Sequence, residues 1–236
     1  NGTSTTQEES NEAIQHAWEV KDHNAPLIQA RNALREAVTL LIERIGMETP
    51  VAGVDYIRDF SNRLEGDDVV ITFNYDVELE KVLIASSRWH FDDDYGLHIN
   101  IFRHRVVAND PQATVSLLKL HGSIGWRQGP DGRLKFEGPI ASYLEPSIQE
   151  GTDSSIASPF EFVDSKRIMI EPSYLKVFDN PDLAKIWAKA AEALSACSEV
   201  TVIGYSFPQA DMAARALITS SLSLRENVPV TVILFL

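Results

Sequence analysis

The sequence is poor in cysteine, in basic residues and in long apolar runs, and each shortage excludes a class of protein. Among 236 residues there is one cysteine, Cys197, which excludes an internal disulfide and a zinc site of three or four thiolates. The 21 basic and 34 acidic residues give a net charge of −13, which argues against a broad basic surface for nucleic acid or anionic lipid. No apolar run approaches the roughly 20 residues that span a bilayer. We expect a cytoplasmic protein that binds neither nucleic acid nor membrane.

An initiator methionine is also missing. The chain begins with ten polar residues and ends inside the strand-like run 230–236. We take both ends as cuts and expect an excerpt of a longer protein.

Apolar periodicity predicts helices in the first third of the chain and alternating strands and helices after it. Helical spacing marks 11–20, 27–45 and 54–64, so 11–66 is treated as a helical subregion. The β-branched run 69–73 is typical of a strand buried on both faces. The next helix is expected over 76–87, with Asp76 as its N-cap. The remaining expected strands are 115–120, 167–170, 200–203 and 230–236, and the remaining helices 182–197 and 211–225.

Strands that alternate with helices require parallel crossover connections. The pattern therefore predicts an α/β fold, a Rossmann-like doubly wound parallel sheet with an additional N-terminal helical region, in a single domain over 1–236. The stretch 126–166 is rich in Gly, Pro and Ser and shows little periodicity. Because it is too long for a plain connection, we expect an irregular insertion or a lid.

Polar residues follow three of the expected strands, and ligands of open parallel sheets bind at the carboxyl ends of strands. The three ends read Thr72-Phe73-Asn74-Tyr75-Asp76, Lys119-Leu120-His121-Gly122-Ser123 and Ile203-Gly204-Tyr205-Ser206. Each has a purely structural alternative: Asn74 can shape a turn, Asp76 can cap a helix and Gly204 can allow tight packing. Their coincidence at one edge of one sheet favours a binding site.

His121 is the strongest single candidate for chemistry. It directly follows an expected buried strand, and Gly122 beside it would let a ligand approach the backbone closely. An imidazole titrates near neutral pH and suits a general base. The other histidines lie in polar or irregular stretches, and the sequence has no His-Glu-x-x-His motif and no cysteine pair. No metal site is predicted.

These motifs, with Pro172-Ser173-Tyr174 and the continuation Phe207-Pro208 to Asp211, resemble in content and order the SIR2-like family of bacterial anti-phage defence proteins, distant relatives of the sirtuins. The similarity runs from about Val69 to Arg225. It implies that Asn74, His121 and Asp76 are catalytic. It further implies cofactor contacts from Thr72, Phe73, Gly122, Gly204, Tyr205, Ser206 and Asp211.

Two departures from the sirtuin pattern carry information. Sirtuins have a four-cysteine zinc module after the His-Gly strand, whereas 125–166 contains no cysteine, which favours the NAD-hydrolysing branch over a typical deacetylase. The family's opening Gly-rich turn, which holds the pyrophosphate, is also missing, and no Gly-x-Gly occurs in the sequence. We expect that turn before Asn1, so residues 1–236 alone should bind NAD weakly.

The resemblance implies an NAD+ hydrolase that cleaves the nicotinamide–ribose bond and defends against phage by NAD depletion. Asn74 would position the ribose and the attacking water, His121 would take a proton, and Asp76 would support the site by hydrogen bonding. A non-catalytic module that senses NAD or ADP-ribose and a zinc-free NAD-dependent protein deacylase remain alternatives. A homo-oligomeric state and fused or associated defence domains also remain open.

Overall fold

The computed structural model describes residues 26–45 (except 28 and 43), 55–89, 95, 97, 115–129, 132–136, 166–169, 180–223, 225 and 228–233. The chain divides into two compact units, 1–45 and 46–236. The helix expected over 11–20 lies outside the described residues. The helical subregion expected over 11–66 is divided between the two units.

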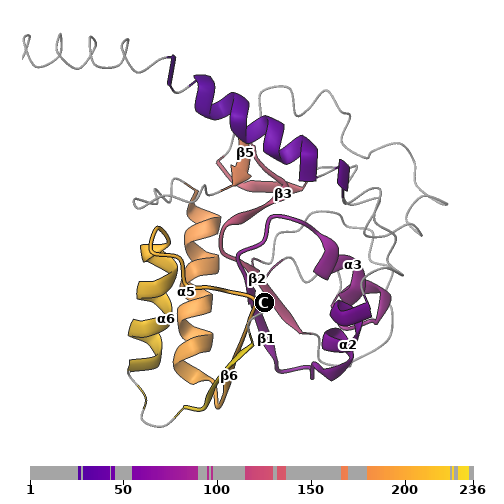
Figure 1. Ribbon diagram of the computed structural model, residues 1–236, viewed down its shortest axis with the longest axis vertical. Helices are drawn as coiled ribbons and strands as arrows, with labels where there is room; N and C mark the ends of the chain where they lie inside the picture. The colour runs from indigo at the N-terminus through magenta and orange to yellow at the C-terminus, as the bar shows by residue number, and fades with distance from the viewer. Residues whose placement is uncertain are drawn as a thin grey trace, which may run out of the picture. The chain divides into compact units, whose positions relative to one another are not determined.

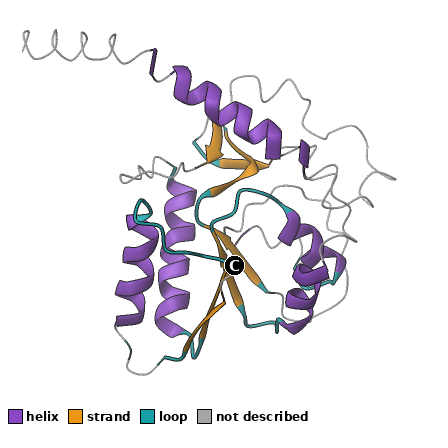
Figure 2. Cartoon of the chain, viewed as in Figure 1, coloured by secondary structure: helices purple, strands orange, loops and turns teal. Residues whose placement is uncertain are grey.

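In the first unit the described residues of 26–45 are helical, which confirms the helix expected over 27–45. Its apolar residues recur at helical spacing but are largely exposed: Leu34 is 66%, Leu41 58% and Ile45 54% exposed. Figure 2 shows this helix in purple near the start of the chain.

The second unit contains two pairs of parallel strands. Strand β1 (Val69–Thr72) pairs with β2 (Ser116–Lys119), and β6 (Val200–Ile203) pairs with β7 (Val230–Ile233). Strand β2 carries the buried Leu117 and Leu118. Strand β1 is not buried on both faces as expected, since Val69 is 41% exposed and the rest of the strand is half-buried. A β-branched run alone does not tell burial on two faces from burial on one.

Helix α5 (Pro181–Ala196) packs against α6 (Met212–Ser223) and β2 (Figure 1). The side chain of Asn180 caps α5 by accepting hydrogen bonds from the backbone N–H groups of Asp182 and Leu183. One stripe of α5 is buried, as expected for an amphipathic helix. It contains Leu183, Ile186, Ala190 and Leu194.

Helices α2 (Asp55–Arg63) and α3 (Glu78–Ala85) also pack together, and the hydroxyls of Ser61 and Ser86 lie 2.7 Å apart between them. Asp76 is not the N-cap of α3. That position belongs to Val77, which makes no side-chain cap, while Asp76 Oδ1 accepts a hydrogen bond of 3.1 Å from the N–H of Glu78.

A third, antiparallel sheet corrects two expectations. Strands β4 (Leu134–Phe136), β3 (Gly122–Gln128) and β5 (Lys166–Met169) pair in that order. The stretch 126–166 is therefore not wholly irregular, because it contributes to all three strands; residues 137–165 lie outside the described part. Strand β5 is antiparallel to its neighbour, so the expected parallel crossover does not hold for it. Short strands of small residues, such as the Gly-Ser-Ile-Gly start of β3, give little periodicity to read.

The described residues thus form an α/β arrangement with two parallel strand pairs and one antiparallel sheet. Its largest buried side chains include Trp89, Tyr95 and Trp126, and these aromatic rings contact one another in series. None of the described helices is both long enough and apolar enough to cross a bilayer.

Candidate functional site

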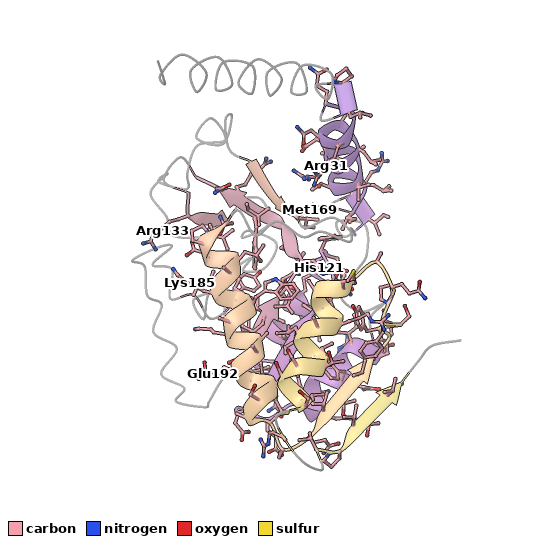
Figure 3. All side chains as sticks on the ribbon, turned by 90° about the vertical axis from the view of Figure 1, so that its left-hand side faces the viewer. Arg31, His121, Arg133, Met169, Lys185 and Glu192 are labelled. Carbon is pink, nitrogen blue, oxygen red and sulfur yellow. The ribbon has the colours of Figure 1, made fainter. Side chains whose placement is uncertain are left out.

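The buried pair His121 and Asp211 forms the centre of the site. His121 follows β2 and is 6% exposed, and Asp211 precedes α6 and is 4% exposed. His121 Nε2 lies 3.2 Å from Asp211 Oδ2. In Figure 3 the labelled His121 lies close to the start of α6, in agreement with this contact. A carboxylate in this position can orient an imidazole and stabilise its protonated form.

Tyr205, which follows β6, completes a three-residue polar cluster with this pair. Its hydroxyl donates a hydrogen bond of 3.0 Å to the same Oδ2 of Asp211. Burial, then the hydrogen bond to Asp211 and its charge, raise the pKa of Tyr205 well above its ordinary value. Tyr205 therefore remains a hydroxyl donor over the physiological range.

The rings of Phe73 and Tyr75 lie beside His121. The ring of Phe73, which follows β1, stacks on Tyr205 with centroids 4.5 Å apart and lies 4.9 Å from the ring of His121. The ring of Tyr75 lies 6.3 Å from His121. The residues that follow β1, β2 and β6 therefore come together at one place. Four of the predicted site residues form a closed series of contacts, in which each touches the next: Phe73, His121, Asp211 and Tyr205.

The backbone on both sides of His121 is held by hydrogen bonds. The Leu120 N–H donates to the carbonyl of Thr72 at 2.9 Å, and the indole N–H of Trp187 donates to the carbonyl of Leu120 at 2.7 Å. These bonds attach the turn that carries His121 to β1 and to α5.

Gly122 has a structural reason to be glycine. Its φ of +82° lies in the left-handed region, and an added Cβ would lie 2.1 Å from the carbonyl oxygen of Ile168. The space beside the glycine is thus filled by the backbone of β5. The contact of Gly122 with a cofactor stays a prediction.

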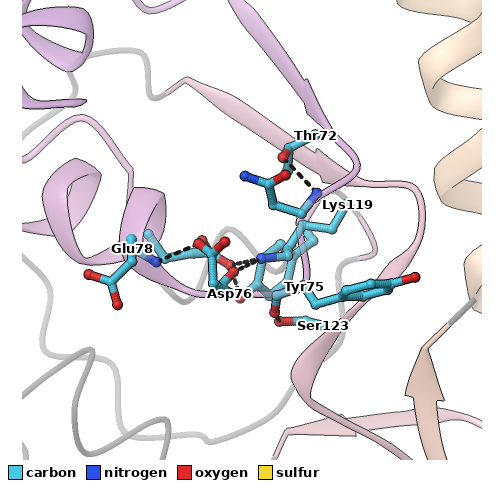
Figure 4. A network of polar contacts seen from close by, with 9 residues as sticks. Thr72, Tyr75, Asp76, Glu78, Lys119 and Ser123 are labelled. Carbon is cyan, nitrogen blue, oxygen red and sulfur yellow. Dashed lines mark hydrogen bonds and ion pairs between the residues drawn. The ribbon is translucent and has the colours of Figure 1, made fainter. Parts of the chain in front are cut away.

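Asn74 and Asp76 lie in the turn after β1, and no contact described for their side chains reaches His121. Asn74 is exposed, and its N–H donates to Thr72 Oγ1 at 3.2 Å. The carbonyl of Tyr75 accepts hydrogen bonds from the N–H of Ile124 and the hydroxyl of Ser123. Figure 4 shows this network of turn contacts. The turn is therefore well held, and the catalytic roles of Asn74 and Asp76 stay predictions.

The segment after β6 reverses direction and delivers Tyr205 and Asp211 to the site. Gly204 has a φ of +66°, and its N–H donates to the carbonyl of Ile233 at 2.8 Å, which extends the contact with β7. Phe207 also has a positive φ, +52°, and its ring packs edge-on against Tyr205 at 4.9 Å. Ser206 is exposed, and its contact with a cofactor stays a prediction.

Sequence reasoning missed a buried ion pair next to the turn after β1. Lys119 Nζ lies 2.7 Å from Glu80 Oε1, and both side chains are 1% exposed. Lys119 also donates a hydrogen bond to the carbonyl of Asp76, and the hydroxyl of Tyr95 donates to Glu80 Oε1 at 3.3 Å. Burial raises the pKa of Glu80, although the charge of Lys119 opposes that shift. The signal in the sequence was a lysine at the end of an apolar strand.

Among the described residues, no group of three or more His, Cys, Asp or Glu side chains is arranged to hold a metal ion. The chain matches no protein-family model, no curated protein and no solved structure.

Proposed function

We propose that the protein is a cytoplasmic SIR2-like NAD+ hydrolase that cleaves the nicotinamide–ribose bond and acts in anti-phage defence by NAD depletion. The observation that carries this proposal is the buried His121–Asp211 pair, at the place where the residues after β1, β2 and β6 meet. Ligands of open parallel sheets bind at this kind of place.

The finer architecture is part of the same proposal. Strands β1, β2, β6 and β7 would belong to one Rossmann-like, doubly wound parallel sheet. The stacking of Phe73 on Tyr205 supports this arrangement, because these rings follow β1 and β6 and their centroids lie 4.5 Å apart.

His121 acts as the general base in this reaction. The bond between the ribose carbon and the nicotinamide nitrogen breaks, nicotinamide leaves, and the ribose carbon takes on oxocarbenium character. Water adds its oxygen to that carbon and gives a proton to His121, directly or through a ribose hydroxyl. Asp211 stabilises the imidazolium that forms, because its carboxylate lies 3.2 Å away and both side chains are buried.

The remaining residues hold the substrate. Asn74, exposed in the turn next to Phe73, positions the ribose and the water. Asp76 supports that turn through its bond to the N–H of Glu78. Phe73 and Tyr205 are half-buried, and their rings provide aromatic surface against which a planar ring of the substrate packs.

The test is nicotinamide release by the full-length protein from NAD+ without any acylated peptide, measured by chromatography. The proposal expects nicotinamide and ADP-ribose in equal amounts, and the same rate from Glu192→Gln, an exposed change on α5. Release only in the presence of an acylated peptide would instead indicate a deacylase. Binding of NAD+ without turnover would indicate a sensing module. Either result would overturn the proposal.

A further inference from the structure

Lys119 belongs to the Lys-Leu-His-Gly-Ser segment, yet the reaction outlined above gives it no role. It is the last residue of β2, and its side chain is 1% exposed. A lysine is almost never buried to this degree unless it is paired. The partners of Lys119 therefore indicate why a lysine is buried here.

The partners of Lys119 connect two elements that carry site residues. Its ammonium group pairs with Glu80 on α3 and also donates to the backbone carbonyl of Asp76 (Figure 4). Asp76 closes the turn that carries Asn74. Lys119 itself lies two residues before His121. The side chain of Lys119 therefore attaches the turn after β1 to β2, the strand that leads to His121.

The register of the sheet makes this attachment direct. Thr72 pairs with Lys119 across the β1–β2 ladder. Asn74 follows Thr72 by two residues, and His121 follows Lys119 by two residues, so the two lie at equivalent positions after the paired strands. A shift of the turn relative to Lys119 would therefore change the distance between Asn74 and His121.

Stability alone gives little reason for a buried ion pair at this position. The desolvation of two charges offsets most of their attraction, and apolar replacements of similar volume often leave stability unchanged or raise it. Glu80 Oε2 has no hydrogen-bond partner among the described residues, so the pair is not fully compensated. What an apolar pair could not supply is the directional bond to the carbonyl of Asp76.

We infer that Lys119 is a positioning residue that fixes the turn 73–76 against the end of β2, and so holds Asn74 in register with His121. The catalytic part of this inference rests on the proposed function. The conformational part does not, because the attachment of the turn can be measured without any substrate.

The test uses three variants of the full-length protein. Lys119→Met removes the charge and the donor at similar length, and Lys119→Met/Glu80→Gln also removes the uncompensated carboxylate. Lys185→Met is the control, since it breaks a lysine–carboxylate pair on α5, Lys185 with Asp182, whose other hydrogen bonds involve Asn180 and Leu134. Amide hydrogen exchange over 73–78 is measured by mass spectrometry, with melting temperature, kcat and KM on the same samples.

The double variant should melt close to the wild type, because no charge is left buried alone. Exchange over 73–78 should nevertheless be faster by about tenfold or more, as expected for a locally opened segment. Its kcat should fall by about 10–10²-fold with a smaller change in KM, the cost of a misplaced catalytic group. The control should match the wild type in exchange over 73–78, in kcat and in KM.

Unchanged exchange over 73–78 in the double variant would overturn the inference, whatever the activity. A double variant with the kcat of the wild type would overturn the inference as well, because the ion pair would then matter only through its charge balance. If the wild-type protein releases no nicotinamide, the proposed function fails, and the exchange data alone decide whether Lys119 holds the turn.

Discussion

His121 Nε2 and Asp211 Oδ2 lie 3.2 Å apart, which joins the residue after β2 to the residue before α6. Through this contact the motif after β2 and the motif after β6 form one buried cluster. The contact gives His121 a buried carboxylate partner, and the cofactor contact predicted for Asp211 stays a prediction. Asp211 additionally accepts a hydrogen bond of 3.4 Å from the N–H of Ala214 at the start of α6.

Asp211→Asn should test that role. Asparagine keeps the size and an oxygen acceptor for Ala214, but it removes the negative charge that faces His121. We expect kcat to fall by about 10²–10⁴-fold with a small change in melting temperature. Steady-state rates of nicotinamide release, normalised to folded protein by circular dichroism, provide the measurement. Wild-type rates in Asp211→Asn would show that the carboxylate does not assist His121.

Tyr205→Phe should separate the hydroxyl of Tyr205 from its ring. Loss of the hydrogen bond to Asp211 is expected to cost about 1 kcal/mol of unfolding free energy, while the ring still stacks on Phe73. Tyr205→Ala, which loses both, should cost about 3 kcal/mol or more. Urea denaturation of the two variants gives the comparison, and equal losses would argue that the ring contributes nothing.

Gly122→Ala should be far more damaging than Gly132→Ala. Both glycines have a left-handed φ, +82° and +77°, so both substitutions strain the backbone by about 1–2 kcal/mol. Only at Gly122 does the new Cβ meet backbone, 2.1 Å from the carbonyl oxygen of Ile168; at Gly132 the nearest atom is a flexible side-chain nitrogen at 3.9 Å. We expect an additional loss of about 1–3 kcal/mol at Gly122. Thermal denaturation of the two variants checks this, and similar melting temperatures would contradict it.

Asp182 should contribute to acid sensitivity. It accepts hydrogen bonds from Lys185 Nζ at 2.8 Å and from the N–H of Leu134 at 3.1 Å. Although burial acts in the opposite direction, the Lys185 and Leu134 hydrogen bonds and nearby positive charge lower the pKa of Asp182 below its ordinary 3.8. A lowered pKa in the folded state stabilises the fold above pH 3.8, and that stabilisation is lost as the pH falls through the lowered pKa.

Asp182→Asn should therefore lower the unfolding free energy at pH 7 and flatten its decline in acid. Denaturation curves at a series of pH values from 7 to about 2 provide the measurement. An acid transition as steep as that of the wild type would assign the sensitivity to other carboxylates.

The sequence predicted the elements with strong patterns and missed those with weak ones. Helix α5 and strand β6 were predicted nearly to the residue, and β7 begins at the predicted residue, because a long amphipathic repeat and β-branched runs leave little ambiguity. Strands β3 and β4 were missed because they are short or rich in small residues. The antiparallel pairing of β5 could not be derived, since the rule for crossover connections applies only to parallel strands.

The candidate site was predicted in part. The motif order pointed to Phe73, His121, Tyr205 and Asp211, and the structure brings these four into contact. The contacts of Asp211 with His121 and of Lys119 with Glu80 could not be derived, because each joins residues far apart in the chain. Spacing along one strand does not show which carboxylate will lie beside a given histidine or lysine.

The most direct test of the proposed function is nicotinamide release by His121→Ala in the full-length protein, measured per folded molecule, with NAD+ affinity and melting temperature recorded on the same samples. Because a general base acts mainly in the transition state, the rate should fall by about 10²–10⁴-fold while the affinity for NAD+ changes little. The variant should remain folded and inactive. Wild-type nicotinamide release from well-folded His121→Ala protein would contradict the account.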